Sequence, residues 1–336
     1  MKIGIVAITS GGRNLAGRLG TLLDDATVLL TQPGAKVADT IGANWHYYDG
    51  FICIMAAGIV VRAIAPLLGD KLTDPCVVVL DEKGSHAISL LAGHVGGGNT
   101  LAEKVAALTG GTAVITTASD TLGLVALDLW AKEQQLAVPD RKVLTSLSTL
   151  LVNQGHLSLY TEMEVSSLPK GLRRVDDALH ADFIVSRATT ITHLRPVFRP
   201  RDLVVGIGCN RGTPGHEFED ALTELFNDLH LSRASIRNLA SIDKKNDETG
   251  LLQFAENNCW PIDFYDSDTI NRQTNLEISF AALGAVGAIG VAEPTALLSA
   301  QSNHLLSRKR KWKNVTMAVA QAPFTLSAQV PAQSKT

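Results

Sequence analysis

Short apolar runs alternate with amphipathic segments through the first third of the chain. The run KIGIVAI is typical of a buried strand, and after the turn TSGGRN the positions Leu15, Leu19, Leu22 and Leu23 fall on one helical face. GFICIM repeats the pattern and is followed by a helix expected to begin near Ile59. Because strands and helices that alternate in this way form parallel sheets, the pattern predicts an α/β fold.

A β-hairpin is expected to interrupt this alternation. CVVVL and HAISLL are two β-rich runs, and the polar turn from Asp81 to Gly84 between them contains a glycine. A helix from Thr100 and the strand TAVIT follow. We therefore expect residues 1–138 to form an N-terminal domain with an open, mostly parallel sheet and one antiparallel excursion.

The pattern weakens over residues 139–201, where LSLYTEM and DFIVS are short and Pro196 and Pro200 indicate a linker. We expect a small middle module there, and then a second α/β domain over residues 202–325, which DLVVGIG opens. Its helices are expected over residues 214–229, 249–257 and 294–300, and SRKRKWKN is expected to be a basic loop before the last strand. Residues 326–336 are expected to be a frayed polar tail.

Charge and composition argue against several classes of function. The formal net charge is −3 and charged residues make up 19% of the chain, which argues against binding to nucleic acid. The uncharged stretch SFAALGAVGAIGVA is shorter than the ~20 apolar residues that span a bilayer, and MKIGIVAITSGG lacks the apolar region of a signal peptide. Four widely spaced cysteines indicate neither a disulfide framework nor a zinc site. A cytoplasmic protein that makes no contact with a membrane is therefore expected.

One histidine stands among four glycines in the segment LAGHVGGGNT. Thr100 and Glu103 have the spacing of a capping box, which would start a helix just after the glycines. The unpaired N–H groups of such a helix end could hold a carboxylate or an oxyanion, while His94 acts as a general base on water. The alternative is a structural turn with a hydrogen-bonding histidine. The loop residues that we expect to face a ligand are Gly96, Gly97, Gly98 and Asn99.

Residues at two other strand ends are further candidates for ligand binding. Gly58 follows GFICIM, and Arg62, expected on the first turn of the next helix, could clamp a carboxylate unless it is a solvated arginine. Thr116, Thr117, Ser119 and Asp120 follow the strand TAVIT. Because ligands bind at strand ends along one edge of an open α/β sheet, these side chains are expected to face one crevice. For Asp120 the alternative is a cap on the next helix.

The last third repeats the order of strand, glycine loop and helix in VVGIGCNRGTPG. Gly208 and Arg211 belong to this segment, and Thr213 is expected to be the N-cap of the helix. The turn SIDKKNDETG adds Lys244 and Glu248. These residues could bind an anion, and a solvated turn is the alternative. The chain has no P-loop and no well-placed dinucleotide-binding fingerprint, which argues against nucleotide binding.

Several motifs, taken in order, resemble one family of enzymes. They are GIVVRAIAP, DEKGSHAISLLAGHVGGGNTLAEKVA, VITTASD, VVGIGCNRGT, LASIDKKNDETGLL and VAEPTALL. The set closely resembles the cobalt-precorrin-5A hydrolases of anaerobic cobalamin biosynthesis and spans nearly the whole chain, with only the middle module weakly matched. Asn210 and Thr249 depart from the family pattern, which often has a basic residue at the first place and a proline at the second.

The resemblance implies a hydrolase that acts on a cobalt-containing macrocycle. Such enzymes open the δ-lactone of ring A and release the extruded carbon with its methyl group as acetaldehyde, which gives cobalt-precorrin-5B. His94 is the expected general base, and Glu103 and Asp120 are the other catalytic candidates.

The resemblance also implies what the protein binds. The substrate brings its own cobalt, so no protein-bound metal and no organic cofactor are expected. Arg62, Arg211 and Lys244 are expected to contact the acetate and propionate carboxylates on the rim of the tetrapyrrole. A homo-oligomer and transient contacts with neighbouring pathway enzymes are the other associations that fit this function.

Two other functions remain open. A cobalt chelatase would use His86 and His94 as ligands, although their spacing is not that of a recognisable metal site. A non-catalytic carrier would hand tetrapyrrole intermediates from one enzyme to the next. Release of acetaldehyde separates the hydrolase from the carrier, because a carrier yields none.

Overall fold

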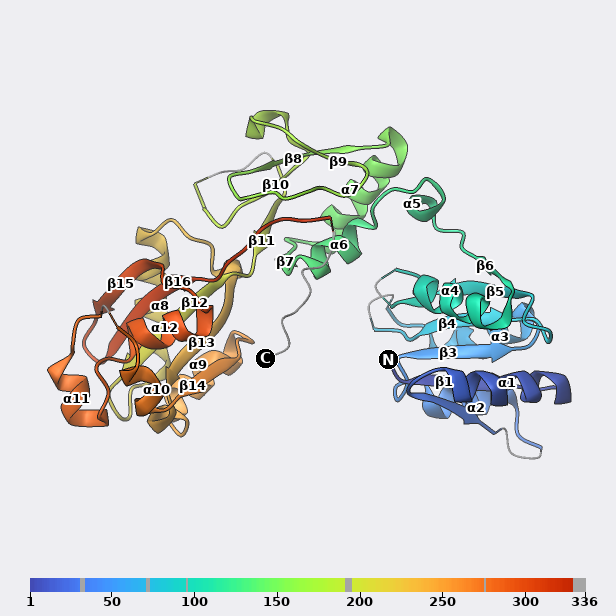
Figure 1. Cartoon of the computed structure of the whole chain (residues 1–336), viewed down its shortest axis with the longest axis horizontal. Coiled ribbons are helices and arrows are strands. Elements are labelled where there is room, and N and C mark those ends of the chain that lie inside the picture. The colour runs from blue at the N-terminus through green and yellow to red at the C-terminus, as the bar shows by residue number, and fades with distance from the viewer. Residues whose placement is uncertain (31–33, 71–72, 95, 191–194, 275, 329–336) are drawn as a thin grey trace. The chain divides into compact units, whose positions relative to one another are not determined.

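The computed structural model describes residues 1–30, 34–70, 73–94, 96–190, 195–274 and 276–328. The chain forms two compact units, Met1–Leu129 and Trp130–Thr336. The first unit contains one sheet and the second contains two (Figure 1). The expected boundary near residue 201 falls between the two sheets of the second unit.

A six-stranded sheet forms the centre of the first unit, in the order β2-β1-β3-β4-β5-β6. The strands β1 to β4 are parallel, β5 is antiparallel to β4, and β6 is parallel to β5. The predicted α/β fold and its antiparallel excursion are therefore confirmed. The strands are β1 (Ile3–Ala7), β2 (Ala26–Leu29), β3 (Gly50–Ile54), β4 (Cys76–Leu80), β5 (His86–Leu91) and β6 (Thr112–Val114).

Helices cover both faces of this sheet. Alternate residues of β1 enter two separate cores, because successive side chains of a strand point to opposite faces. Ile5 packs with α1 and α4, and Val6 packs with α2 and α3. The helices of this unit are α1 (Ser10–Leu22), α2 (Val37–Asn44), α3 (Ala57–Ile64), α4 (Gly98–Thr109) and the short α5 (Ala118–Thr121).

Two local expectations in this unit are wrong. Leu22 is 52% exposed, because the helix ends there and the extended Leu23 enters the core instead. Helix α3 begins at Ala57 rather than near Ile59, so Arg62 lies in the last turn of the helix and not in the first.

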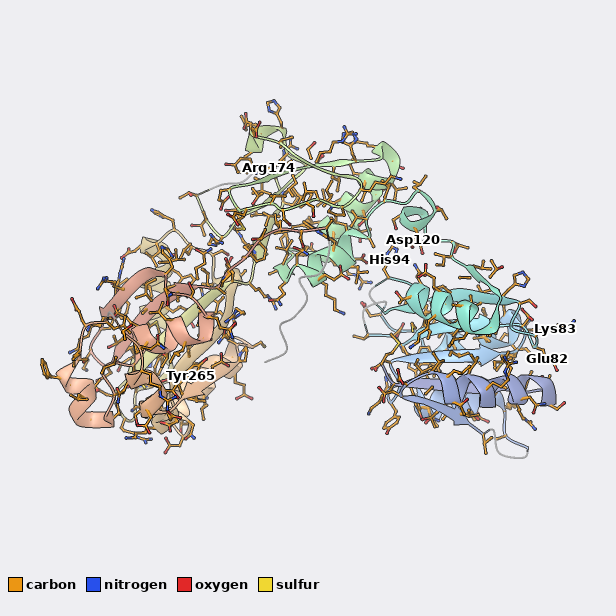
Figure 2. The ribbon with its side chains drawn as sticks, in the orientation of Figure 1. Glu82, Lys83, His94, Asp120, Arg174 and Tyr265 are labelled. Atoms are coloured by element: carbon orange, nitrogen blue, oxygen red, sulfur yellow. The ribbon has the colours of Figure 1, made fainter. Side chains whose placement is uncertain are left out.

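The antiparallel strand β5 decides which loops can meet. β1, β3 and β4 end at one edge of the sheet, whereas β5 and β6 end at the opposite edge. The loop with His94 and the segment with Asp120 therefore share one edge, and Gly58 and Arg62 lie at the other. Figure 2 shows His94 and Asp120 at one end of this unit and Glu82, in the turn after β4, at the other. The expectation of a single crevice for all the strand ends is wrong.

The first sheet of the second unit has the order β7-β11-β10-β8-β9. The expected linker at Pro196 and Pro200 is in fact β11, which pairs with β10 on one side and with β7 on the other. The prolines flank and end a short strand, where a missing N–H costs little. The elements are α6 (Leu127–Glu133), β7 (Leu136–Ala137), α7 (Arg141–Gln154), β8 (Leu157–Thr161), β9 (Leu172–Arg174), β10 (Phe183–Val185) and β11 (Val197–Pro200).

The second sheet has the order β14-β13-β12-β16-β15. Parallel strands β12, β13 and β14 follow the predicted α/β pattern, and the expected basic loop is the edge strand β15, paired antiparallel with β16. Its charged run has no hydrophobic period, so the strand could not be recognised. The strands are β12 (Leu203–Cys209), β13 (Ile236–Ile242), β14 (Ile262–Tyr265), β15 (Leu305–Lys311) and β16 (Val315–Gln321).

Helices α8 and α9 pack on one face of this sheet and α12 packs on the other. A Cβ atom at Gly206 would collide with the carbonyl of Ala292, so glycine permits α12 to lie directly on β12. Pro214 rather than Thr213 is the N-cap of α8. The helices are α8 (Gly215–Asp228), α9 (Thr249–Asn257), α10 (Ser267–Asn271), α11 (Phe280–Val286) and α12 (Ala292–Ala300).

The first residues of the expected polar tail are fixed to the first sheet of the second unit. Leu326 is fully buried and bridges to Val165, and the Trp130 indole donates to the carbonyl of Ser327. Residues 329–336 lie outside the described residues. Over the described ranges, no helix has the length and apolar character needed to cross a membrane.

Candidate active site

The imidazole of His94, in the loop after β5, lies between two carboxylates. Its Nε2 atom is 3.0 Å from Oδ2 of Asp120, and its Nδ1 atom is 3.5 Å from Oδ1 of Asp128. The hydroxyl of Ser119 is 3.2 Å from Nε2. The side chain of His94 is 19% exposed, so solvent and a ligand can still reach the ring. Figure 2 shows His94 and Asp120 side by side.

A buried amide, that of Asn99, connects this loop to the segment after β6. Its Nδ2 donates to Oδ2 of Asp120 at 2.7 Å and to Oγ1 of Thr117 at 3.3 Å, while its Oδ1 has no partner among the described residues. A Cβ atom at Gly93 would lie 2.5 Å from that oxygen, so the approach of the amide requires glycine there. The predicted residues Asn99, Thr117 and Asp120 therefore belong to one polar network with His94.

The carboxylates control the charge of this imidazole. Asp128 beside Nδ1 is the main cause that raises the pKa of His94 above its ordinary value, Asp120 raises it further, and partial burial opposes both. Protonation is therefore favoured. When the imidazolium loses a proton, Asp128 retains the one on Nδ1, so Nε2 becomes the basic atom. The arrangement can take a proton from a nucleophile at Nε2 and stabilise the resulting imidazolium.

The glycine loop differs from the predicted anion nest. The N–H groups of Gly97, Gly98 and Asn99 donate to the carbonyls of His94, Ala92 and Gly93, at 2.9 to 3.1 Å. Three of the backbone donors expected to hold an oxyanion are therefore already bonded. The loop positions His94 instead of presenting these amides to a ligand.

The capping box predicted at Thr100 and Glu103 is wrong. Gly97 is the N-cap of α4, with φ of +82°, and both residues lie inside the helix. Glycine closes this helix end through its left-handed backbone, so no side chain is needed. Glu103 is exposed and makes no hydrogen bond or ion pair with His94 in the described structure. Thr116 is likewise exposed, and Asp120 is not the cap of α5, because Thr117 is.

Gly58 and Arg62 belong to a separate place in the first unit. The guanidinium of Arg62 donates to the carbonyl of Gly58 at 2.9 Å, within its own helix. A mostly apolar cavity of about 450 Å³ lies at this edge of the sheet, lined on its polar side by Thr9, Asp81 and Glu82. Arg62 does not line it.

In the second unit, the charged side chains predicted to bind a ligand already have partners within the protein. Arg211 pairs with Asp247 at 2.5 Å and donates to the carbonyl of Lys244, whose own amine donates to the carbonyl of Val286 at 2.9 Å. A Cβ atom added at Gly208 would lie 3.4 Å from the side chain of Val291.

The side chain of Glu248 is buried and connects two loops of the second unit. It is 4% exposed, accepts from the N–H of Gly212 at 2.6 Å and lies 3.3 Å from the buried amine of Lys245. Burial raises the pKa of the Cys209 thiol to about 11, so that residue is protonated at neutral pH. Around this loop the buried carboxylate is neutralised by a lysine, whereas His94 lies between two carboxylates.

Asp128 is the residue of this cluster that sequence reasoning missed. It lies in the first turn of α6, where an acidic residue is usual because it complements the helix dipole. Nothing in the sequence pairs it with His94. Ser119 was visible only as one of several hydroxyl residues after the strand TAVIT.

The described residues do not gather three or more potential ligands around a metal position. His86 begins β5 and pairs with Asp81 at 3.5 Å, whereas His94 follows the other end of the strand. The strand separates the two histidines by roughly 17 Å, at ~3.4 Å per residue. They cannot share a metal ion, which removes the ligand pair proposed for a chelatase.

Comparison with known proteins identifies two matching families of sequence. Residues 39–120 match the model "Cobalamin synthesis G N-terminal", and residues 203–320 match "Cobalamin synthesis G C-terminus". The first range contains His94, Asn99 and Asp120.

Two relatives match over nearly the whole chain. The cobalt-precorrin-5A hydrolase of Priestia megaterium is 32% identical, with 95% of each chain covered. The cobalt-precorrin-5A hydrolase of Salmonella typhimurium is also 32% identical, with 96% of this chain and 98% of the relative covered. A solved cobalamin biosynthesis protein G homolog from Sulfolobus solfataricus is 20% identical, with 96% of this chain and 97% of that chain covered and a TM-score of 0.39.

Proposed function

The chain belongs to the cobalamin synthesis G family, and from that premise we propose that it is a cobalt-precorrin-5A hydrolase. It opens the ring A δ-lactone of its macrocyclic substrate and releases the extruded carbon as acetaldehyde, which leaves cobalt-precorrin-5B. The observation that carries the catalytic proposal is the imidazole of His94, held at its two nitrogens by Asp120 and Asp128.

In the first step, His94 acts as the general base. Nε2 takes a proton from water as the water oxygen bonds to the lactone carbonyl carbon. Asp128 keeps the proton on Nδ1 and stabilises the imidazolium, as in other acyl-transfer sites with a histidine and a carboxylate. Asp120 shares Nε2 in the resting protein, so we assign it a positioning role, with its carboxylate fixed by Asn99.

The oxyanion that forms in this step needs a donor. Since the amides of Gly97, Gly98 and Asn99 are bonded within the loop, we assign this role to the hydroxyl of Ser119, 3.2 Å from Nε2 and therefore next to the attacked carbon. This assignment replaces the glycine nest that the sequence suggested.

In the second step, the tetrahedral intermediate collapses and the lactone C–O bond breaks. The freed alkoxide becomes the carbonyl of acetaldehyde as the C–C bond to the macrocycle breaks, and the electron pair of that bond passes into the conjugated ring. The cobalt is part of the substrate, and the proposal requires no cofactor from the protein.

The proposed contacts with substrate carboxylates change with the geometry. Arg62 lies at the edge of the sheet away from His94, so we leave it out of this site. Arg211 and Lys244 remain proposed contacts in the second unit, where they would exchange their present partners for carboxylates. Glu248 is left out, since it is buried and paired.

Acetaldehyde formation tests the proposed function against the carrier. The purified chain is mixed with cobalt-precorrin-5A, and acetaldehyde is measured by coupled reduction to ethanol, while mass spectrometry follows the macrocycle. The proposal predicts one acetaldehyde for each macrocycle converted, over many turnovers. A macrocycle that stays bound and unchanged would favour the carrier.

The cellular setting is part of the same proposal. All four cysteines are free, which suits a reducing cytoplasm. The proposal includes a homo-oligomer and transient contact with enzymes that supply or take up the unstable macrocycle. Sedimentation of the purified chain tests the first, and crosslinking in extracts tests the second.

A further inference from the structure

The basic run of the β15–β16 hairpin divides between the two faces of its sheet. On the face covered by α8, Arg310 pairs with Asp228 at 2.7 Å, and the indole of Trp312 donates to Glu224 at 2.9 Å. Lys309 and Lys311 alternate with Arg310 along the strand, and together with Lys313, which follows the strand, they line a cavity on the other face of the sheet. The run is therefore not uniform: one half is bonded to α8 and the other is directed to the α12 face.

A cavity of about 380 Å³ lies on that other face. The end of β12, the hairpin, and the segment that contains α11 and the start of α12 enclose it. Its cationic lining residues are Lys245, Lys309, Lys311 and Lys313. Its apolar wall is formed by small and branched residues, which are Ala281, Ala282, Ala285, Val286, Ile289 and Val291.

Among the residues that the structure describes, two of these lysines are without a counterion. Lys245 is paired with Glu248, and the amine of Lys309 is 3.9 Å from Glu277. Over the residues that the structure describes, Lys311 and Lys313 have no carboxylate within ion-pair distance. The cavity therefore has an excess of positive charge.

A buried carboxylate in the lining does not cancel this charge completely. Glu293 is 4% exposed, and its Oε1 atom accepts a hydrogen bond from the N–H of Lys309 at 2.9 Å. With Glu277 in the lining and Glu248 beside Lys245, three acidic groups stand against four lysines, which leaves a surplus of one positive charge. An anionic ligand would be stabilised by the surplus, more strongly in a partly closed cavity than on an open surface.

We infer that this cavity binds carboxylate-bearing arms on one edge of a tetrapyrrole. The amines of Lys311 and Lys313 contact the carboxylates, and the alanine-rich wall packs against the methylene groups that carry them. The volume is near the lower limit for small-molecule sites, about 300 Å³, so arms enter while the ring stays at the mouth. The choice of a tetrapyrrole, among carboxylate ligands, rests on the proposed function.

The competing explanation is that lysines on an edge strand only prevent association with other sheets. That role depends on charge at the edge and not on the face of the sheet. Arg308 provides the matched control, because it lies on the same strand, is exposed and does not line the cavity. The comparison is thus between charge reversals in one hairpin that differ in whether the residues line the cavity.

The experiment measures binding of cobyrinic acid, which is not a substrate, to the full-length chain by equilibrium dialysis. Lys311→Glu combined with Lys313→Glu is expected to weaken binding by at least about tenfold, the effect of losing one strong charge-assisted contact. Arg308→Glu is expected to change it less than about threefold, the scale of a screened surface charge. The methyl ester of cobyrinic acid should bind weakly to all three proteins.

Equal losses in the cavity and control variants would overturn the inference, as would tight binding of the ester that depends on the same lysines. If the double variant does not fold, acetylation of the parent protein decides the question. Cobyrinic acid should then protect Lys311 and Lys313 but not Lys104, and uniform acetylation would reject the site.

Acetaldehyde release separates a failure of this inference from a failure of the proposed function. If the parent protein releases acetaldehyde but the cavity and control variants bind cobyrinic acid equally well, only the proposed cavity site is rejected. A binding difference in a parent that releases none supports the cavity and rejects the hydrolase.

Discussion

Two loops with the same order of strand, glycines and helix have opposite electrostatic character. After β5, His94 is held by Asp120 and Asp128, and both carboxylates raise its pKa. Beside the loop after β12, the buried Glu248, which follows β13, is neutralised by Lys245 and by the N–H of Gly212 in that loop. Both carboxylates beside His94 come from the chain after β6, whereas the ammonium that pairs with Glu248 lies three residues before it in the turn after β13. The comparison teaches that a glycine loop specifies a position, while the residues brought to it specify the chemistry.

Glu248→Ala should produce the largest loss of stability in this comparison. It leaves the ammonium of Lys245 buried without its partner, which costs about 3–5 kcal/mol of unfolding free energy. Urea denaturation measures the loss. Asp247→Ala removes a carboxylate from the same turn that is exposed and should leave the midpoint nearly unchanged. Similar midpoints for both variants would show that Glu248 is not the structural anchor of this loop.

Gly206→Ala should have a smaller but still clear effect. The added methyl group would meet the carbonyl of Ala292, and displacement of α12 is expected to cost about 1–3 kcal/mol. Gly208→Ala is the matched change two residues along β12, where the added carbon would lie 3.4 Å from Val291, in ordinary contact. The midpoint of thermal unfolding is measured for both variants. A Gly208→Ala protein that is less stable than the Gly206→Ala protein would contradict the packing described.

Asp128→Asn should shift a pH profile. Without the carboxylate beside Nδ1, the pKa of His94 falls, so the neutral base is present at lower pH. The acidic limb of kcat for acetaldehyde release should therefore move to lower pH. Glu133→Gln, on the same helix, should leave the limb in place. An unmoved limb in Asp128→Asn would assign the titration to another group.

The same carboxylates link His94 to folding stability. A pKa raised in the folded protein adds stability that is present below the ordinary pKa of an unfolded imidazole, and this is lost as the pH rises through the folded value. In Asp128→Asn this dependence on pH should become weaker. Urea denaturation of both proteins at several pH values measures whether the free energy of unfolding falls with rising pH less steeply in the variant.

Much of the fold could be predicted because its strands are short apolar runs and its helices are amphipathic. β11 escaped prediction because prolines flank and end it, and β15 because charged residues occupy both of its faces. The start of α4 was misplaced because Gly97 caps the helix through its backbone. Thr100 and Glu103 have the spacing of a capping box, but they lie inside the helix and do not cap it.

The site could be predicted only in part. His94, Asn99 and Asp120 stood near strand ends, and the structure brings them together. Asp128 lies on a different helix, and only the course of the chain after β6 places it beside Nδ1. Arg62 was assigned to the same crevice because the sequence does not show that β5 runs antiparallel to β4. That direction places the end of β5, and with it His94, at the edge opposite to the end of β3. Sequence patterns identify strand ends, but strand pairing decides which of them are neighbours.

Single-turnover release of acetaldehyde by His94→Ala tests the central claim most directly. If His94 is the general base, the rate should fall by about 10²- to 10⁴-fold, while the folded protein still binds cobalt-precorrin-5A. His86→Ala, which removes an exposed histidine from the start of the same strand, should keep the parent rate. A rate in His94→Ala within a few-fold of the parent would contradict the account, and the base would then have to be sought outside this cluster.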